Sequence, residues 1–331
     1  MNTKNNKKEE KKYKQIYSGI GGQAVIEGIM MKNGTDYAVG VRKPDGTIAV
    51  EKSKYISMTD RYPFLKIPFI RGIFSFADSM ILGMRALNLS AEYYGEDDTE
   101  EKPGKLEKWF SDKLGEKAES ILQGIVMVFS FAAAILLFVL FPAFVAGLFK
   151  PWIRREAWIG LIEGIFRVFL FVLYIKLVSR MPDIRRTFEY HGAEHKCINC
   201  VEHGLPLTVD NVLSSSKEHK RCGTSFIVYV MLISILLFMV IRTDTIWLRF
   251  LSRIILIPVI AGISYEVLRI VGMHDNLLTH ILFIPGMWMQ GLTTKEPDRE
   301  EAEVAIRAVE AVFDWRQFLE KNFQAPSENI A

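Results

Sequence analysis

Long hydrophobic runs with few charges dominate the chain after residue 120. A membrane-spanning helix needs about 20 mainly apolar residues. Four runs approach or exceed this length, so we expect four transmembrane helices, at residues 121–149, 158–178, 225–241 and 254–271. A further apolar run at 277–290 is shorter and is broken at Pro285-Gly286. That pattern is typical of a re-entrant or interfacial segment.

Short runs rich in β-forming residues occupy residues 19–62. The runs 23–31, 37–42 and 47–51 are separated by Asn33-Gly34 and by Pro44-Asp45-Gly46. Both separators favour tight turns. We therefore expect a small three-stranded antiparallel unit at the N-terminal end, on the cytoplasmic side.

Residues 63–92 mix Phe, Ile and Met with regularly spaced charges. Such a segment is too charged to span and is typical of an amphipathic helix in the membrane interface. Residues 1–18 are rich in Lys, Glu and Asn, which predicts a disordered tail. Residues 93–118 are polar and contain Pro103-Gly104, which predicts a linker.

Polar segments also follow the expected helix pairs. Transmembrane helices 1 and 2 fall in 119–179, and helices 3 and 4 with the short apolar run fall in 224–292. Between the two pairs, we expect residues 180–223 to form a polar loop. After the second pair, we expect residues 293–331 to form a tail that contains a helix at 300–318. Basic residues gather in the loop and before the first span, which places the loop and both termini in the cytoplasm. The expected fold is a mainly α, multi-pass protein of the cytoplasmic membrane.

Composition agrees with this assignment. Half of the residues are hydrophobic, 12% are aromatic, and the net charge is only +3. A charge this small gives no reason to expect nucleic acid as a partner, so the bilayer is the expected environment. All three cysteines fall in residues 180–223, which indicates reduced thiols rather than a disulfide scaffold.

The polar loop also holds four of the six histidines. His191, Glu194 and His195 form the pattern H-x-x-E-H. On a helix, residues four apart share a face, so both imidazoles could bind one ion with the carboxylate beside it. This is the order of inverted zinc peptidases, in which the Glu acts as a general base. His219 or Cys222 could complete such a site.

A second metal pattern overlaps the first. Cys197-x-x-Cys200 and His219-x-x-Cys222 have the spacing of a zinc ribbon, which holds a closed structural site. A third interpretation involves no metal, because histidines can simply form hydrogen bonds and buried cysteines can simply pack.

Charges also fall inside the expected spans. Glu163 and Arg167 are four residues apart, and Glu266 and Arg269 are three apart. Charged residues in hydrocarbon usually face a bundle interior and pair there. They are either structural ion pairs or a polar seam that binds a substrate or a partner.

Five motifs together resemble one known family. They are residues 21–28 (GGQAVIEG), 68–72 (PFIRG), 191–196 (HGAEHK), 219–226 (HKRCGTSF) and 292–298 (LTTKEPD). The chain resembles the YqhQ-like family of bacterial membrane proteins of unknown function, often described as metal-dependent enzymes. The resemblance runs from residue 21 to about 313. It implies a site at His191, Glu194, His195, His219 and Cys222, and leaves Cys197 and Cys200 outside the pattern.

Two functional hypotheses follow. In the first, the chain is a cytoplasm-facing metalloprotein, a hydrolase that holds Zn²⁺ through His191, His195 and His219 and/or Cys222. Glu194 would then activate water. In the second, it is a non-catalytic scaffold or membrane-protein biogenesis factor, with a structural metal or none. Its basic juxtamembrane segments would dock a membrane-protein partner or anionic lipid.

Overall fold

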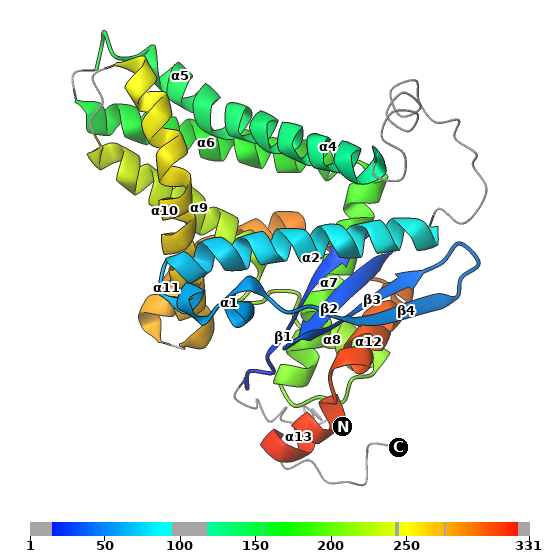
Figure 1. The fold of residues 1–331 in the computed structure, drawn as a ribbon. Helices are drawn as coiled ribbons and strands as arrows, with labels where there is room; N and C mark the ends of the chain where they lie inside the picture. The colour runs from blue at the N-terminus through cyan, green and yellow to red at the C-terminus, as the bar shows by residue number, and fades with distance from the viewer. Residues whose placement is uncertain (1–14, 95–117, 154, 242–244, 275, 324–331) are drawn as a thin grey trace, which may run out of the picture.

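The structure is a computed structural model that describes residues 15–94, 118–153, 155–241, 245–274 and 276–323. A small sheet and its covering helices form one part of the molecule, which we call the sheet domain, and long apolar helices form the other (Figure 1). Most of the expected N-terminal tail and linker, and the last residues of the C-terminal tail, lie outside the described residues.

The N-terminal unit is an antiparallel sheet of four strands, not three. They follow one another in the order β1 (Ile20–Val25), β2 (Gly28–Asn33), β3 (Asp36–Arg42) and β4 (Ile48–Lys54). The single strand expected at 23–31 is split by a reversal at Ile26-Glu27. Glu27 takes the left-handed conformation, with φ of 46°. Glycine or asparagine normally marks such a turn, so the sequence carried no signal for it.

The sheet is covered on both faces. Side chains alternate along β2, so Ile29 and Met31 face one core while Met30 faces the other. α7 (Pro182–Glu202) and α12 (Arg299–Val312) pack on the first face. α2 (Ile70–Tyr94) packs on the second.

The expected polar loop at 180–223 is instead largely helical. α7 fills its first half and is buried from residue 192 to residue 202, and α8 (Val209–Ser214) follows it. Apolar residues recur every three or four positions along α7 at Tyr190, Ala193, Cys197 and Val201, and they enter the core. From the sequence, we expect only the H-x-x-E-H part on a helix, because charged residues between these positions conceal the helical period of the rest.

The helix expected at 300–318 is two helices. α12 ends at Val312, and α13 (Trp315–Phe323) continues after a short break. Both bury apolar side chains in the core beside α7. The segment therefore packs on the sheet domain, as its periodicity indicated.

The segment expected as an interfacial helix begins with two short helices, α1 (Met58–Arg61) and η1 (Pro63–Lys66, a 3-10 helix), before α2. α2 confirms the helix, but Leu82 and Ala86 bury its second half on the sheet. Only its first part is available for a membrane.

The apolar part contains the helices that lie above and to the left of the sheet in the view of Figure 1. They are α4 (Ala118–Ile135), η3 (Leu136–Leu140, a π-helix), α5 (Phe141–Gly147), α6 (Glu156–Val178), α9 (Gly223–Val240), α10 (Ile246–Met273) and α11 (Leu277–Thr293). Among the described residues, three helical stretches are long and apolar enough to cross a membrane, namely Gly124–Gly147, Gly223–Val240 and Trp247–Met273.

Three of the four expected spans coincide with these stretches. The fourth, 158–178, lies in α6, a 23-residue helix beside α9 that is not among the three. The short apolar run forms α11, which continues as one helix through Pro285.

Candidate metal centre

The H-x-x-E-H motif lies on α7, as its spacing requires. The rings of His191 and His195 are neighbours on one face of the helix, with ring centroids 4.4 Å apart. Pro182 at the first turn starts α7 without needing a main-chain donor. The core contacts of α7 then fix the direction in which the two imidazoles point.

Cys222 reaches the same point from another element. It is the N-cap residue of α9, and its Sγ accepts from the main-chain N–H of Thr224. The His191 Nε2 atom lies 3.2 Å from this Sγ. One donor atom from each of His191, His195 and Cys222 lies within 4.8 Å of the other two. The structure thus brings together three of the four residues expected to bind metal.

Both histidines are oriented by main-chain carbonyls. His191 Nδ1 lies 3.0 Å from the Thr293 carbonyl oxygen, and His195 Nδ1 lies 2.6 Å from that of Lys217. A carbonyl can only accept, so each Nδ1 donates its proton and each Nε2 is left for the centre. Metal-binding histidines in proteins are normally held in this way.

The electrostatics of the cluster couple the thiol to an imidazole. Burial acts to raise the pKa of Cys222, but His191 and His195 outweigh it and hold this pKa well below its usual range. Burial likewise acts to lower the pKa of His191, but the Cys222 sulfur raises it to about 9. The pair therefore shares a proton between Nε2 and Sγ, the position that a cation would occupy on binding.

Glu194 lies on the same helix and is only 6% exposed. Burial raises the pKa of its carboxyl, while His195 and His191 oppose that rise and Gly22 on β1 contributes a main-chain hydrogen bond. β1 passes so closely that a Cβ on Gly22 would lie 3.1 Å from the Glu194 Cγ. The sheet thus fixes the carboxylate within electrostatic range of the cluster.

His219 lies beside the three grouped residues without joining them. Its ring centroid is 5.6 Å from that of His195, but its Nε2 lies 3.7 Å from a Glu202 oxygen. Its main chain is held by Gln290 of α11, which accepts from its N–H and donates to its carbonyl. Burial lowers the pKa of His219, although the hydrogen bond to Glu202 opposes this.

Glu202 organises this side of the centre. It is fully buried and accepts hydrogen bonds from Gln15, from Ser18 and from Arg221. Burial acts to raise its pKa, but His219 and Arg221 lower it to about 2. Glu202 therefore carries a negative charge that ties the N-terminal segment to the residues before α9.

Cys197 and Cys200 lie in the apolar core with Tyr190 and Ile198. Burial raises the pKa of both thiols, to about 12 at Cys200. They belong to a different group of contacts from Cys222. The geometry therefore does not assemble the four donors of the zinc-ribbon pattern at one point.

The chain segments around the centre are held by side chains of α7. Lys196 and Asn199 donate to four main-chain carbonyls between residues 213 and 218. Lys196 and Lys217 also both pair with Glu296, at 3.0 Å each. The sequence offered no signal for these contacts, because their acceptors are mostly main-chain oxygens.

The first of the two charge pairs expected inside the apolar part, Glu163 with Arg167, is joined and has additional partners. Arg167 Nη2 lies 3.0 Å from Glu163, and Arg253 of α10 binds both oxygens of the same carboxylate at 3.0 and 2.7 Å. Arg167 also donates to Ser234 and to the Phe138 carbonyl in the π-helix. One acidic residue therefore ties α6 to α10, and Arg167 extends the network to α9 and η3.

Glu266 finds its partner outside its own helix. Its carboxylate accepts from both Nε and Nη2 of Arg71 on α2. Arg269, the residue expected as its partner, contributes only a weaker charge interaction. The sequence could not identify Arg71, because nearly 200 residues separate the two side chains.

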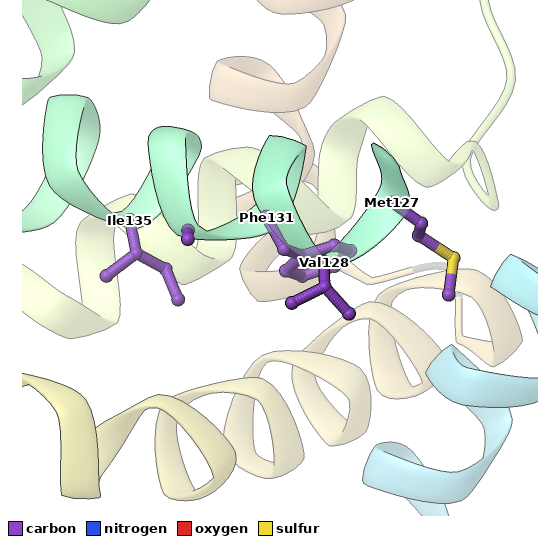
Figure 2. A pocket seen from close by; sticks show the side chains of 5 residues that line it. Met127, Val128, Phe131 and Ile135 are labelled. Carbon is purple, nitrogen blue, oxygen red and sulfur yellow. The ribbon is translucent and has the colours of Figure 1, made fainter. Parts of the chain in front are cut away.

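A separate pocket of about 450 Å³ lies along α4. Figure 2 shows Met127, Val128, Phe131 and Ile135 lining it. Its lining is entirely apolar, so it has no groups for chemistry, and it includes none of the residues expected at the site.

The comparisons with known proteins identify relatives but no activity. The pattern of a family described as protein of unknown function (DUF1385) matches residues 67–315. The chain is 38% identical to the uncharacterized protein YqhQ of Bacillus subtilis (strain 168) over 317 residues, which cover 96% of this chain and 98% of that protein. No solved structure matches the chain. The expected resemblance is confirmed, and the chain belongs to the DUF1385 family of proteins of unknown function.

Proposed function

We propose that this chain is a multi-pass membrane metalloprotein with a zinc centre at His191, His195 and Cys222, and that it acts as a hydrolase. The observation that carries the proposal is the convergence of these three donor atoms within 4.8 Å. The donor atoms come from α7 and from the start of α9. Because these elements are separated in the chain, only the tertiary fold brings the donor atoms together.

The donor set fits zinc. Imidazole nitrogen and thiolate sulfur suit Zn²⁺ better than Mg²⁺ or Ca²⁺, which prefer oxygen. Zinc binds nitrogen at about 2.0–2.1 Å and sulfur at about 2.3 Å, so two such donors of one tetrahedral ion lie roughly 3.6 Å apart. The 3.2 Å between His191 Nε2 and Cys222 Sγ is close to that separation. Small side-chain movements would complete the site.

Three protein donors leave one tetrahedral position for another ligand, which is the usual composition of a catalytic zinc site. When bound, zinc lowers the pKa of coordinated water and so supports hydrolysis at neutral pH. Glu194 would accept the proton from that water and deliver it to the leaving group. Because Glu194 is held between α7 and β1, its carboxylate would keep one orientation toward that water.

The membrane assignment adds α6 as a fourth span. Its 23 residues cover about 35 Å, enough for the hydrocarbon core. Its charges at Glu163 and Arg167 are buried, where they pair with each other and with side chains of α9 and α10 instead of meeting lipid. With four spans, the sheet domain, the metal centre and both termini would lie on one side, and the distribution of basic residues favours the cytoplasmic side.

One observation favours the second hypothesis, a scaffold with a structural metal. His195 is 1% exposed and Cys222 is 4% exposed, and His191 alone is partly exposed, so most of the centre is covered in this conformation. Structural zinc sites are closed, whereas catalytic ones admit a substrate. A hydrolase would have to move the segments around residues 213–218 or 293–298 to admit one.

Cobalt substitution separates the two hypotheses. Purified protein is loaded with Co²⁺, and its visible spectrum is recorded before and after azide is added. A replaceable fourth ligand predicts a spectral change on adding azide, in wild type and in Glu194→Gln alike, because Glu194 is not a ligand. A cobalt spectrum that azide leaves unchanged supports the closed structural site, and failure to bind cobalt contradicts both metal hypotheses.

A further inference from the structure

A group of exposed apolar side chains lies just before α2 and in its first turn. Its members are Tyr62, Phe64, Ile67, Phe69, Ile70 and Ile73. Phe64 is the most exposed, at 68%. A contiguous apolar surface of this kind marks a contact with lipid or with another protein. We call residues 62–73 the α2 tip.

The α2 tip is attached to the middle of α10 by close main-chain contact. A Cβ on Gly262 would lie 2.7 Å from the Phe69 carbonyl oxygen, and a Cβ on Gly72 would lie 2.7 Å from the Tyr265 side chain. Both glycines therefore permit the approach of the two segments. Phe69 has φ of 68°, a conformation that is unfavourable for a non-glycine residue and is held here by the contact with α10.

The position of this contact fixes the depth of the tip. α10 contributes the apolar stretch Trp247–Met273, and about 20 residues are needed to cross the hydrocarbon core. Every window of that length within the stretch includes Gly262 and Glu266. If α10 crosses the bilayer, the residues that touch these two positions lie at the depth of the acyl chains.

Two polar groups of the tip are met by α10, while the charged side chain of Lys66 pairs with Asp60 and is long enough to extend to the interface. The Phe69 N–H donates to Glu266, and the Arg71 guanidinium binds the same carboxylate. Pro63 and Pro68 have no N–H to satisfy. Non-helical main chain is tolerated in hydrocarbon only where it is buried in protein or lines a water-filled cavity, and the contact with α10 covers the main chain at Phe69 and Gly72.

α2 leaves the bilayer a few residues later. The ring of Phe76 stacks on that of Phe226, with centroids 5.5 Å apart. Phe226 lies in the first turn of α9, the end that carries the metal centre. Beyond this point α2 packs on the sheet through Leu82 and Ala86.

We propose that the α2 tip is a re-entrant element that enters the leaflet next to the metal centre and places Phe64 and Ile67 among lipid acyl chains. The occupant of its apolar surface is lipid, because the tip packs on α10, a candidate span that carries exposed apolar side chains of its own. The segment expected to lie flat in the interface is thus a helix that begins inside the bilayer and ends on the sheet.

Site-directed spin labelling tests this placement. Phe64→Cys and Ile67→Cys are labelled with a nitroxide in the full-length protein, in nanodiscs of phosphatidylethanolamine and phosphatidylglycerol. Val50→Cys on β4 is the control, since Val50 is also an exposed apolar residue but lies at the sheet edge. Wild type, whose three cysteines are all buried, gives the background.

We expect labels at 64 and 67 to collide with oxygen and to be shielded from a water-soluble nickel complex, with the reverse at 50. Access of the nickel complex at 64 and 67 equal to that at 50 would overturn the proposal. Shielding from both reagents would also overturn it, because it would mean that protein, a second copy or a partner, covers the tip. Unchanged circular dichroism melting of each variant shows that the fold is retained.

Discussion

The Nε2 atom of His191 lies 3.2 Å from the Sγ of Cys222, although 31 residues separate them in the chain. The first is in the middle of a buried helix of the sheet domain, and the second caps a helix that is apolar enough to span a membrane. The candidate centre therefore joins the two parts of the molecule. A metal ion held there would link the sheet domain directly to the apolar helices.

Close packing of β1 on α7 leads to the first prediction. A Cβ on Gly22 would lie 2.6 Å from the Met30 carbonyl oxygen and 3.1 Å from the Glu194 Cγ, whereas one on Gly21 would meet nothing within 4 Å. Gly22→Ala should therefore destabilise the protein by about 1–3 kcal/mol and displace Glu194. Gly21→Ala should be nearly neutral. Thermal unfolding of both variants in the same detergent checks this; equal stabilities would contradict the close contact.

The buried carboxylate of Glu163 leads to the second prediction. Glu163→Gln leaves the guanidinium groups of Arg167 and Arg253 without their anion in a region shielded from water. Removing one partner of a buried pair typically costs about 3–5 kcal/mol. The exposed pair of Asp210 and Arg299 is the control, and Asp210→Asn should cost less than about 1 kcal/mol. Denaturant titration in detergent micelles measures both, and a cost at Glu163 no larger than at Asp210 would contradict a structural role for the network.

The third prediction concerns Glu301, at the start of α12, and how the stability of the protein depends on pH. Burial raises the pKa of this carboxyl to about 7, and one of its oxygens is buried without a hydrogen-bond partner. In the unfolded chain this carboxyl loses its proton near the ordinary pKa of a glutamate, whereas in the folded protein it keeps the proton up to about pH 7. Stability should therefore fall as pH rises from about 5 to 7.

Glu301→Gln provides the control, because its side-chain oxygen can still accept the capping bond from Asp298. Melting temperatures at several pH values should decline with rising pH more steeply in wild type than in this variant. Parallel curves would show that Glu301 titrates normally in the folded protein.

Several features of the fold could be predicted from sequence because one local property decides each. Charge-free length identified the three candidate spans, and Asn33-Gly34 identified the β2–β3 turn. The reversal at Glu27 could not be predicted, because its support is distant: Arg186 of α7 pairs with the Glu27 side chain, and the Arg42 N–H donates to its carbonyl.

The candidate site was predictable in its side chains and not in its supports. The four-residue spacing of His191 and His195 identified a shared helical face. What excluded His219 from the group was the charge of Glu202 and the hold of Gln290 on its main chain. These contacts depend on tertiary structure, and a sequence pattern treats His219 and Cys222 as equivalent candidates.

Elemental analysis of protein purified without added metal tests the claim that His191, His195 and Cys222 hold a metal ion. Wild type should carry close to one zinc per chain, Cys222→Ser should lose most of it, and Cys200→Ser should retain it because Cys200 lies in the core. Wild type that is free of metal and of normal stability, or equal zinc in both variants, would contradict the claim.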